Sequence, residues 1–312
     1  MRILFMGTPE FALPSLGILL ENQYPVVAVA TTPDRPKGRG QKTAGSPVKE
    51  FALQHHLPLL QPESLNDPGF VSSVSELQPD LIVVVAFRIL PKEIYTIPRL
   101  GSFNLHASLL PKFRGAAPIN WAIIRGEKGT GVTTFFLKDK VDTGSLLLQA
   151  RVAIGPDETA GELYDKLAEV GAEIVLQTVR LIERGKARPL PQDDAQATTA
   201  PKIFKDDCRL SWSGSARTVH NMVRGLSPHP CAWTMHQERV LRIYRTAMQS
   251  EQKGSAQNAP SGTVMTVEKE NLVVATAEGM LSILDIQQEG KKRMGIAEFL
   301  RGYPMQAGDV LH

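Results

Sequence analysis

The apolar stretch Asp80 to Ala86 restricts the fold of this chain more than any other segment. After the aspartate it reads Leu-Ile-Val-Val-Val-Ala, so the side chains on both of its faces are apolar. β-Branched residues favour strands, and a strand that is apolar on both faces must be covered on both sides. Such strands occupy the centre of parallel sheets that are flanked by helices. The stretch therefore predicts an α/β fold.

The N-terminal residues predict the first strand and helix of that sheet. Arg2 to Met6 is a short, mainly apolar run that ends at Gly7, and a helical spacing of apolar residues begins after Thr8-Pro9. Thr8 is a suitable N-cap, with Pro9 at the first helical position. The turn lacks the G-x-G-x-x-G pattern, and Pro9 removes an amide that a phosphate would use. A nicotinamide or flavin dinucleotide is therefore not expected.

Two polar residues share one face of the next predicted strand, Gly101 to His106. Side chains alternate along a strand, so Asn104 and His106 point to one side and their apolar neighbours point to the other. An amide and an imidazole at the end of an apolar strand cost free energy unless partners satisfy them, which favours a functional site. A solvated strand end is the alternative interpretation.

Asp142 can bring a negative charge to this pair. It begins an Asp-Thr-Gly turn between the apolar runs Val132 to Leu137 and Leu146 to Val152, which predict a pair of strands. An aspartate in such a position often does no more than cap its own turn. The spacing alone leaves the turn role and the catalytic role equally open.

A group of cations follows the second predicted strand, Val26 to Thr31. The segment Thr31 to Ser46 contains Arg35, Lys37, Arg39 and Lys42 against a lone Asp34, together with several glycines and prolines. It leaves the edge of the sheet where ligands bind in open α/β folds. We interpret it as a loop without packing of its own that orders on contact with a phosphate backbone. A solvated loop is the alternative.

The C-terminal part has the pattern of a separate β domain. Residues 188–206 predict a linker, because they are polar and contain prolines. They separate a first domain of residues 1–187 from a second of residues 207–312. In the second domain, short β-like runs between polar turns predict a small barrel. These runs are Ala232 to Met235, Val240 to Thr246, Gly262 to Val267, Leu272 to Thr276 and Met280 to Ile286.

Other classes of protein lack their motifs in this chain. Ser108 lies near His106, but no G-x-S-x-G elbow surrounds it, which argues against a serine hydrolase. Cys208 and Cys231 have no C-x-x-C partner and no histidine at zinc-finger spacing, so we expect neither a disulfide framework nor a metal. No apolar stretch of 18 residues occurs, so we expect a soluble, cytoplasmic protein without membrane association.

Taken together, these motifs resemble the formyltetrahydrofolate-dependent formyltransferases. The resemblance lies in Asn104, His106, the Ser-Leu-Leu-Pro sequence at Ser108 to Pro111, and Asp142, and it extends over nearly the whole chain. A departure lies at Ala86 to Pro91, where the family more often has an aromatic residue, a glycine and one extra residue. Further matching segments, in order, are Met6 to Ala12, Pro33 to Gly40, Ser46 to Lys49, Gly115 to Pro118, Leu163 to Leu167 and Leu210 to Trp212.

The resemblance implies a Rossmann-like parallel-sheet domain, followed by a small OB-like β-barrel that binds tRNA. It also implies 10-formyltetrahydrofolate as co-substrate and Asn104, His106 and Asp142 as catalytic residues. In formyl transfer, Asn104 and a protonated His106 would donate to the oxyanion, while Asp142 would keep His106 charged or accept the amine proton. The residues predicted to contact the folate are Ser108, Leu109, Leu110, Pro111, Phe87, Arg88, Ile89 and Leu90.

The acceptor of the formyl group is a separate question. The resemblance implies the α-amino group of methionine on initiator tRNA, formylated for translation initiation, and a monomeric enzyme. A 4-amino-sugar nucleotide is the alternative acceptor. The family's Pro-Asp-Arg-Pro-x-Gly-Arg-Gly loop, matched by Pro33 to Gly40, favours tRNA. The residues expected to contact the tRNA are Arg35, Lys37, Arg39 and Lys42.

Overall fold

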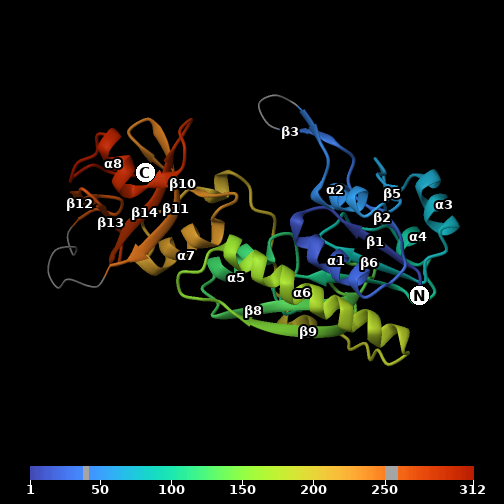
Figure 1. Cartoon of the computed structure of the whole chain (residues 1–312). Coiled ribbons are helices and arrows are strands. Elements are labelled where there is room, and N and C mark those ends of the chain that lie inside the picture. Colours follow the sequence, from blue (N-terminus) through green and yellow to red (C-terminus); the bar gives the residue numbers. More distant parts are fainter. Residues whose placement is uncertain (38–41, 250–258) are drawn as a thin grey trace. The chain divides into compact units, whose positions relative to one another are not determined.

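The computed structural model describes residues 1–37, 42–249 and 259–312, which form two compact units (Figure 1). Neither unit is a continuous stretch of the chain. The first unit consists of Met1–Ala116, Thr130–Val152 and Tyr164–Ala200, and the second of Ala117–Gly129, Ala153–Leu163 and Pro201–His312. The predicted boundaries at residues 187 and 207 remain a prediction, but the packing places residues 188–200 with the first unit.

The first unit contains a seven-stranded sheet in the order β5-β2-β1-β6-β7-β8-β9. The first five strands of this order run parallel, and β8 is antiparallel to β7. β6 lies at the centre and is buried along its whole length, as its sequence predicts. The strands are β1 (Ile3–Gly7), β2 (Val26–Ala30), β5 (Leu59–Leu60), β6 (Leu81–Val85), β7 (Ser102–His106), β8 (Gly129–Phe136) and β9 (Leu146–Ala153).

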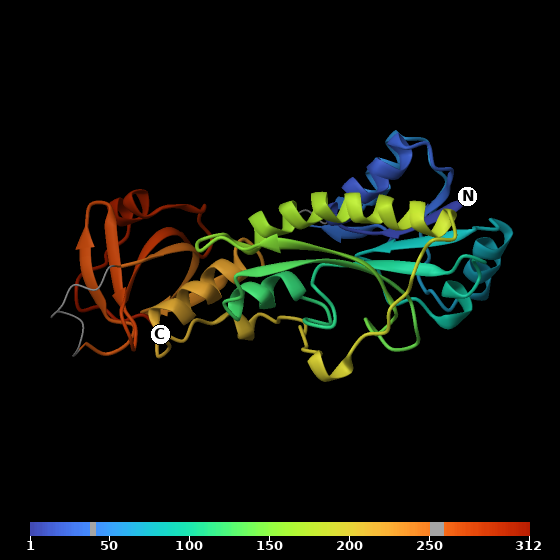
Figure 2. The same ribbon diagram turned by 90° about the horizontal axis from the view of Figure 1, so that it is seen from below.

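Helices cover both faces of this sheet. On one face Phe70 and Ile94 share a core with Val84 of β6. On the other face α6 packs against β7. Gly171 of α6 lies so close to Leu105 of β7 that a Cβ added to the glycine would be 2.7 Å from a methyl group of Leu105. Figure 2 shows α6 lying along the sheet. The helices are α1 (Leu13–Glu21), α2 (Pro47–Gln54), α3 (Pro68–Glu76), α4 (Lys92–Tyr95) and α6 (Ala160–Glu183).

The helix starts follow local chemistry, with one exception. Ser46 and Asp67 cap α2 and α3, because their side chains accept hydrogen bonds from the amides of Lys49 and Phe70. The prediction that Thr8 caps the first helix is wrong. That helix begins as a short 3-10 turn, η1 (Glu10–Ala12), without a side-chain cap, and the Thr8 hydroxyl is buried without a partner among the described residues.

The described part of the basic segment contains two strands that were not predicted. They are β3 (Arg35–Lys37) and β4 (Lys42–Ala44), which pair as a two-stranded antiparallel ribbon. At its base, Asp34 accepts hydrogen bonds from Lys49 and Gln61, and both lower the pKa of Asp34. The prediction overlooked the pairing because Gly- and Pro-rich sequences give no strand signal.

The second unit contains an antiparallel sheet in the order β10-β11-β14-β13-β12, with β15 added to β14. The five predicted strands are all present, whereas β15 and α8 were not predicted. Trp212, Val223 and Ile283 are among the residues of its core. The elements are α5 (Pro118–Ile124), α7 (Ala216–Leu226), β10 (Ala232–His236), β11 (Arg239–Met248), β12 (Val264–Glu268), β13 (Asn271–Ala275), β14 (Met280–Gln288), β15 (Met294–Gly295) and α8 (Ile296–Gly302).

The C-terminal residues connect the two edges of this antiparallel sheet. Leu311 pairs with His236 of β10, and Val310 pairs with Thr263 just before β12. The backbone of His312 exchanges two hydrogen bonds of 2.9 Å with Met235. Edge strands are thereby paired, as a small barrel requires. None of the helices in the described part of the chain has the length and apolar character that a bilayer crossing requires.

Candidate active site

The polar pair of β7 lies at the carboxyl edge of the parallel strands. β7 pairs with β6 on one side and with β8 on the other. Phe103 and Leu105 are buried on one face, whereas Asn104 is half-buried and His106 is buried on the other. The alternation predicted from the sequence is therefore confirmed. Within the described residues, no protein group forms a hydrogen bond with the Asn104 side chain.

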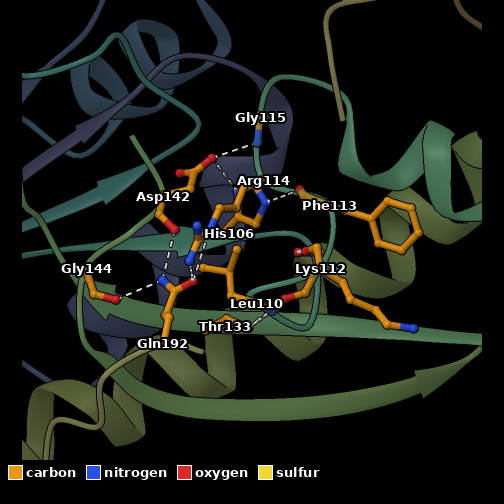
Figure 3. Close-up of polar contacts among 11 residues, drawn as sticks. His106, Leu110, Lys112, Phe113, Arg114, Gly115, Thr133, Asp142, Gly144 and Gln192 are labelled. Atoms are coloured by element: carbon orange, nitrogen blue, oxygen red, sulfur yellow. Dashed lines mark hydrogen bonds and ion pairs between the residues drawn. The ribbon is translucent and has the colours of Figure 1, made fainter. Parts of the chain in front are cut away.

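His106 has one ring nitrogen committed and one available (Figure 3). Its Nε2 lies 2.8 Å from the carbonyl oxygen of Phe113. A carbonyl only accepts, so Nε2 carries a proton and donates. The other nitrogen, Nδ1, lies 3.8 Å from Oδ2 of Asp142. Any donation from His106 to a ligand therefore requires a proton on Nδ1, on the side of Asp142.

Asp142 is held by a distant part of the chain and not by its own turn. Its Oδ2 accepts a 2.8 Å hydrogen bond from the amide of Gly115, 27 residues away. The side chain is 10% exposed. Its φ of +56° lies in the left-handed region, which aspartate tolerates better than most residues. The carboxylate thus points away from the turn and towards His106.

The Ser-Leu-Leu-Pro segment forms a tight turn fixed by β8 and β9. The Ser108 hydroxyl donates to the carbonyl of Lys112, and the Thr133 hydroxyl donates to the carbonyl of Ser108, both at 2.6 Å. Gln149 donates to the carbonyl of Leu110 at 2.8 Å. Ser108 and Leu110 are buried, whereas Leu109 and Pro111 keep accessible surface. In this conformation Ser108 and Leu110 support the turn, and the other two can touch a ligand.

The predicted folate wall follows β6 at the same edge of the sheet. Ile89 is 73% exposed, and Leu90 is buried in the core. The Arg88 guanidinium donates to the carbonyls of Pro62 and Glu63 at 2.7 and 2.9 Å and lies over the ring of Phe87. Burial, with a smaller contribution from the charge of Arg35, lowers the pKa of Arg88. Arg88 therefore anchors this segment to the chain that follows β5.

Of the four predicted tRNA contacts, the structure describes only one side chain. Arg35 is exposed at the start of β3. Lys37 and Lys42 belong to β3 and β4, but their side chains lie outside the described residues, as does the whole of Arg39. Their contact with nucleic acid stays a prediction.

Sequence reasoning missed two residues beside Asp142. Gln192, in the segment predicted as a linker, donates to the carbonyls of Asp142 and Gly144 at 2.9 and 2.8 Å. Arg114 in turn donates to the side-chain oxygen of Gln192. A polar segment without periodicity gives no signal that it belongs to a site. Among the described residues, no three His, Cys, Asp or Glu side chains gather as metal ligands would.

Comparison with known proteins agrees with the fold. The family model described as formyl transferase matches residues 1–179, and that described as formyl transferase, C-terminal domain, matches residues 202–304. The chain therefore belongs to the formyl transferase family.

Within that family, methionyl-tRNA formyltransferases match this chain over its full length. The one from Acetivibrio thermocellus is 48% identical over 312 residues, which is all of this chain and 99% of the relative. The one from Caldanaerobacter subterraneus subsp. tengcongensis is also 48% identical and covers all of both chains.

Solved structures show the same fold at lower identity. HypX from Aquifex aeolicus, in complex with tetrahydrofolic acid, has a TM-score of 0.67 and 19% identity, covering 99% of this chain and 50% of HypX. WlaRD, a sugar 3N-formyl transferase, has a TM-score of 0.67 and 19% identity, covering 94% of this chain and 99% of WlaRD.

Proposed function

We propose that this chain transfers the formyl group of 10-formyltetrahydrofolate to the α-amino group of methionine on initiator Met-tRNA. The observation that carries the proposal is its 48% identity to methionyl-tRNA formyltransferases over the full length of both chains. The Asn104, His106 and Asp142 arrangement supports it, because those groups suit the chemistry of formyl transfer. We further propose a monomeric enzyme of the cytoplasm.

The reaction passes through a tetrahedral oxyanion when the amine attacks the formyl carbon. Hydrogen-bond donors aimed at that oxygen lower the barrier. The Asn104 amide has no partner among the described residues, so its N–H groups are available for this purpose. A proton on Nδ1 of His106 supplies a second, charged donor. Nε2 cannot take this role while it donates to Phe113.

Asp142 supports the same step in two ways. A gap of 3.8 Å to Nδ1 of His106 is too long for a hydrogen bond but short enough for attraction between opposite charges. The carboxylate therefore faces Nδ1 without occupying its N–H. Its Oδ1 has no hydrogen bond from the described residues and can accept the proton that the attacking amine loses. No covalent intermediate is required.

The co-substrate and the acceptor approach the same edge of the sheet. The accessible surfaces of Leu109 and Pro111 offer apolar contacts to the folate from the Ser-Leu-Leu-Pro turn, and the exposed Ile89 offers them from the Phe87 to Leu90 segment. For the tRNA, the exposed Arg35 and the other cations of the basic segment supply phosphate contacts. Folate binding by Ser108 and Leu110 would require the Ser-Leu-Leu-Pro turn to open, because both are buried.

The decisive experiment offers the purified protein two acceptors in parallel. With 10-formyltetrahydrofolate present, formylation of charged initiator Met-tRNA and of a 4-amino-sugar nucleotide is measured over the same enzyme concentrations. We expect product with the tRNA and at most a trace with the sugar. Efficient formylation of the sugar and none of the tRNA would overturn the proposal. A His106→Ala variant in each assay controls for contaminating activity.

A further inference from the structure

The segment 188–200 contributes a side chain to the region of the site. Gln192 points at the turn that begins with Asp142, as Figure 3 shows. Its Nε2 donates to the carbonyl of Asp142 at 2.9 Å and to that of Gly144 at 2.8 Å. One amide thus uses both of its N–H groups to hold the turn on either side of Thr143.

The orientation of this amide follows from its other neighbour. Nε and Nη2 of Arg114 lie 3.1 and 2.7 Å from the Gln192 side chain. A guanidinium has only donors, so the atom that faces it must be the oxygen of Gln192. The NH₂ group therefore faces the two carbonyls, which can only accept. Arg114 is fixed in turn, because its backbone pairs with Thr198 and Ala200.

The turn needs these hydrogen bonds from Gln192 because of the conformation of Asp142. A non-glycine residue at φ +56° is in a sparsely populated region, which persists when the surroundings enforce it. The hydrogen bonds within the turn itself run from Thr143 to the carbonyl of Lys140. They do not engage the carbonyl of Asp142. Gln192 holds that carbonyl, while the amide of Gly115 holds the carboxylate.

We infer that Gln192 is a positioning residue that acts through Asp142, an inference that rests on the proposed function. By fixing the backbone of Asp142, it sets the distance between the carboxylate and Nδ1 of His106. Misplacement of a catalytic group by about 1 Å can lower the rate by about 100-fold. Loss of the Gln192 donors should therefore lower kcat by about 10- to 100-fold and leave the KM of both substrates within about 3-fold.

Two substitutions separate the donors of Gln192 from its acceptor. Gln192→Glu keeps an oxygen for Arg114 and removes the N–H groups, whereas Gln192→Met removes both. If the donors matter, both variants lose kcat alike. Gln196→Ala is the matched control, because its amide, four residues along the same segment, donates to Asp193 and to no other described residue. It should behave as the wild type does.

A double-substitution test distinguishes positioning from a general structural role. If Gln192 acts through Asp142, then Gln192→Met should cost less than about 3-fold in an Asp142→Asn background, because coupled residues are not additive. A full additional loss of 10-fold or more in that background would overturn the inference. So would an unchanged kcat in both single variants of the full-length protein.

A measurement without substrates keeps this inference separate from the proposed function. Hydrogen–deuterium exchange of the peptide that spans residues 139–146 should accelerate in Gln192→Met and not in Gln196→Ala. Unchanged exchange would contradict the inference whatever the enzyme formylates. If the wild-type protein fails to formylate Met-tRNA while the exchange behaves as expected, the proposed function is wrong. The inference that Gln192 fixes the backbone of the Asp142 turn is then still supported.

Discussion

The two sides of the site differ in how far they are fixed before any ligand binds. On the Asp142 side, His106, Asp142 and Gln192 all have hydrogen-bond partners within the protein. On the side that we propose to bind the folate, called the folate side below, Ile89 is 73% exposed, and Arg88 anchors its segment. Groups that stabilise a transition state act best when they need not reorganise, whereas a binding wall can be completed by its ligand.

This difference leads to distinct kinetic expectations for the two sides. Interactions made only in the transition state affect kcat, and interactions present equally in the bound ground state affect KM. Substitutions on the Asp142 side should therefore act on kcat, and those on the folate side on KM.

The largest effect is expected from the residues that we propose to be catalytic. Replacement of Asn104 or His106 by alanine should lower kcat by about 10² to 10³, because each removes one donor to the oxyanion. Asp142→Asn should lower it by about 10² to 10⁴, because it removes a charge and a proton acceptor. Steady-state kinetics provide the test, with circular dichroism to confirm folding. A folded His106→Ala protein with near-normal turnover would rule out this assignment.

A smaller effect should appear on the folate side. Ile89→Asp places a charge where we expect the folate to cover an apolar side chain. Loss of that burial, worth about 1.5 to 3 kcal/mol, should raise the KM for 10-formyltetrahydrofolate by about 10- to 150-fold. kcat should stay within about 3-fold. Leu53→Asp is the matched control, because Leu53 is an exposed apolar residue on α2, 54% accessible. A loss of kcat with constant KM in Ile89→Asp would contradict the expected difference between the two sides of the site.

Substitutions in the basic segment should change neither kcat nor the KM for 10-formyltetrahydrofolate. Neutralising Arg35 and Arg39 together should weaken tRNA binding and reduce the slope of log K against log salt by about 0.7 to 0.9 for each phosphate that the protein no longer neutralises. A control with Arg184 and Lys186 neutralised removes two exposed cations that follow the C-terminal end of α6. The salt dependence of tRNA binding is the measurement. Equal slopes in the two double variants would argue against tRNA contact and favour the alternative interpretation, in which the basic segment is only solvated.

The smallest effect concerns a residue outside both sides of the site. His220 of α7 is 2% exposed, and burial lowers its pKa below the ordinary 6.5. The unfolded chain then binds this proton more readily, so stability is retained above the unfolded pKa and lost as the pH falls below it.

Thermal unfolding at pH about 7.5 and about 5.5 tests this expectation. Tm should drop further for the wild type than for His220→Gln, by at most about 4 °C, while kcat at the higher pH is the same in both. The exposed His55, changed in the same way, serves as control. An equal drop in Tm for the wild type and His220→Gln would exclude His220 as the source.

The parts of this structure that could be predicted from sequence are those with local periodicity. An unbroken β-branched run indicates β6, and the alternation along β7 places Asn104 beside His106. The hold of Gln192 on Asp142 joins positions 50 residues apart in sequence, and a polar segment carries no pattern that reveals such a contact. Thr8 fits the rule for an N-cap, yet the 3-10 turn that precedes the helix leaves its hydroxyl unused.

The interleaving of the two units restricts how such a chain can be recombined. α5 precedes β8 in sequence but packs on α7, where a Cβ on Gly225 would meet the side chain of Ile124 at 2.6 Å. A chimera joined at residue 200 would therefore combine α5 from one parent with α7 from another. Exchange of the C-terminal part succeeds only if α5 is exchanged together with it, or if the α5 surface of the recipient already fits the new α7. The second unit consists of three separate segments of the chain. A single crossover, whether natural or engineered, therefore cannot exchange this unit as a whole.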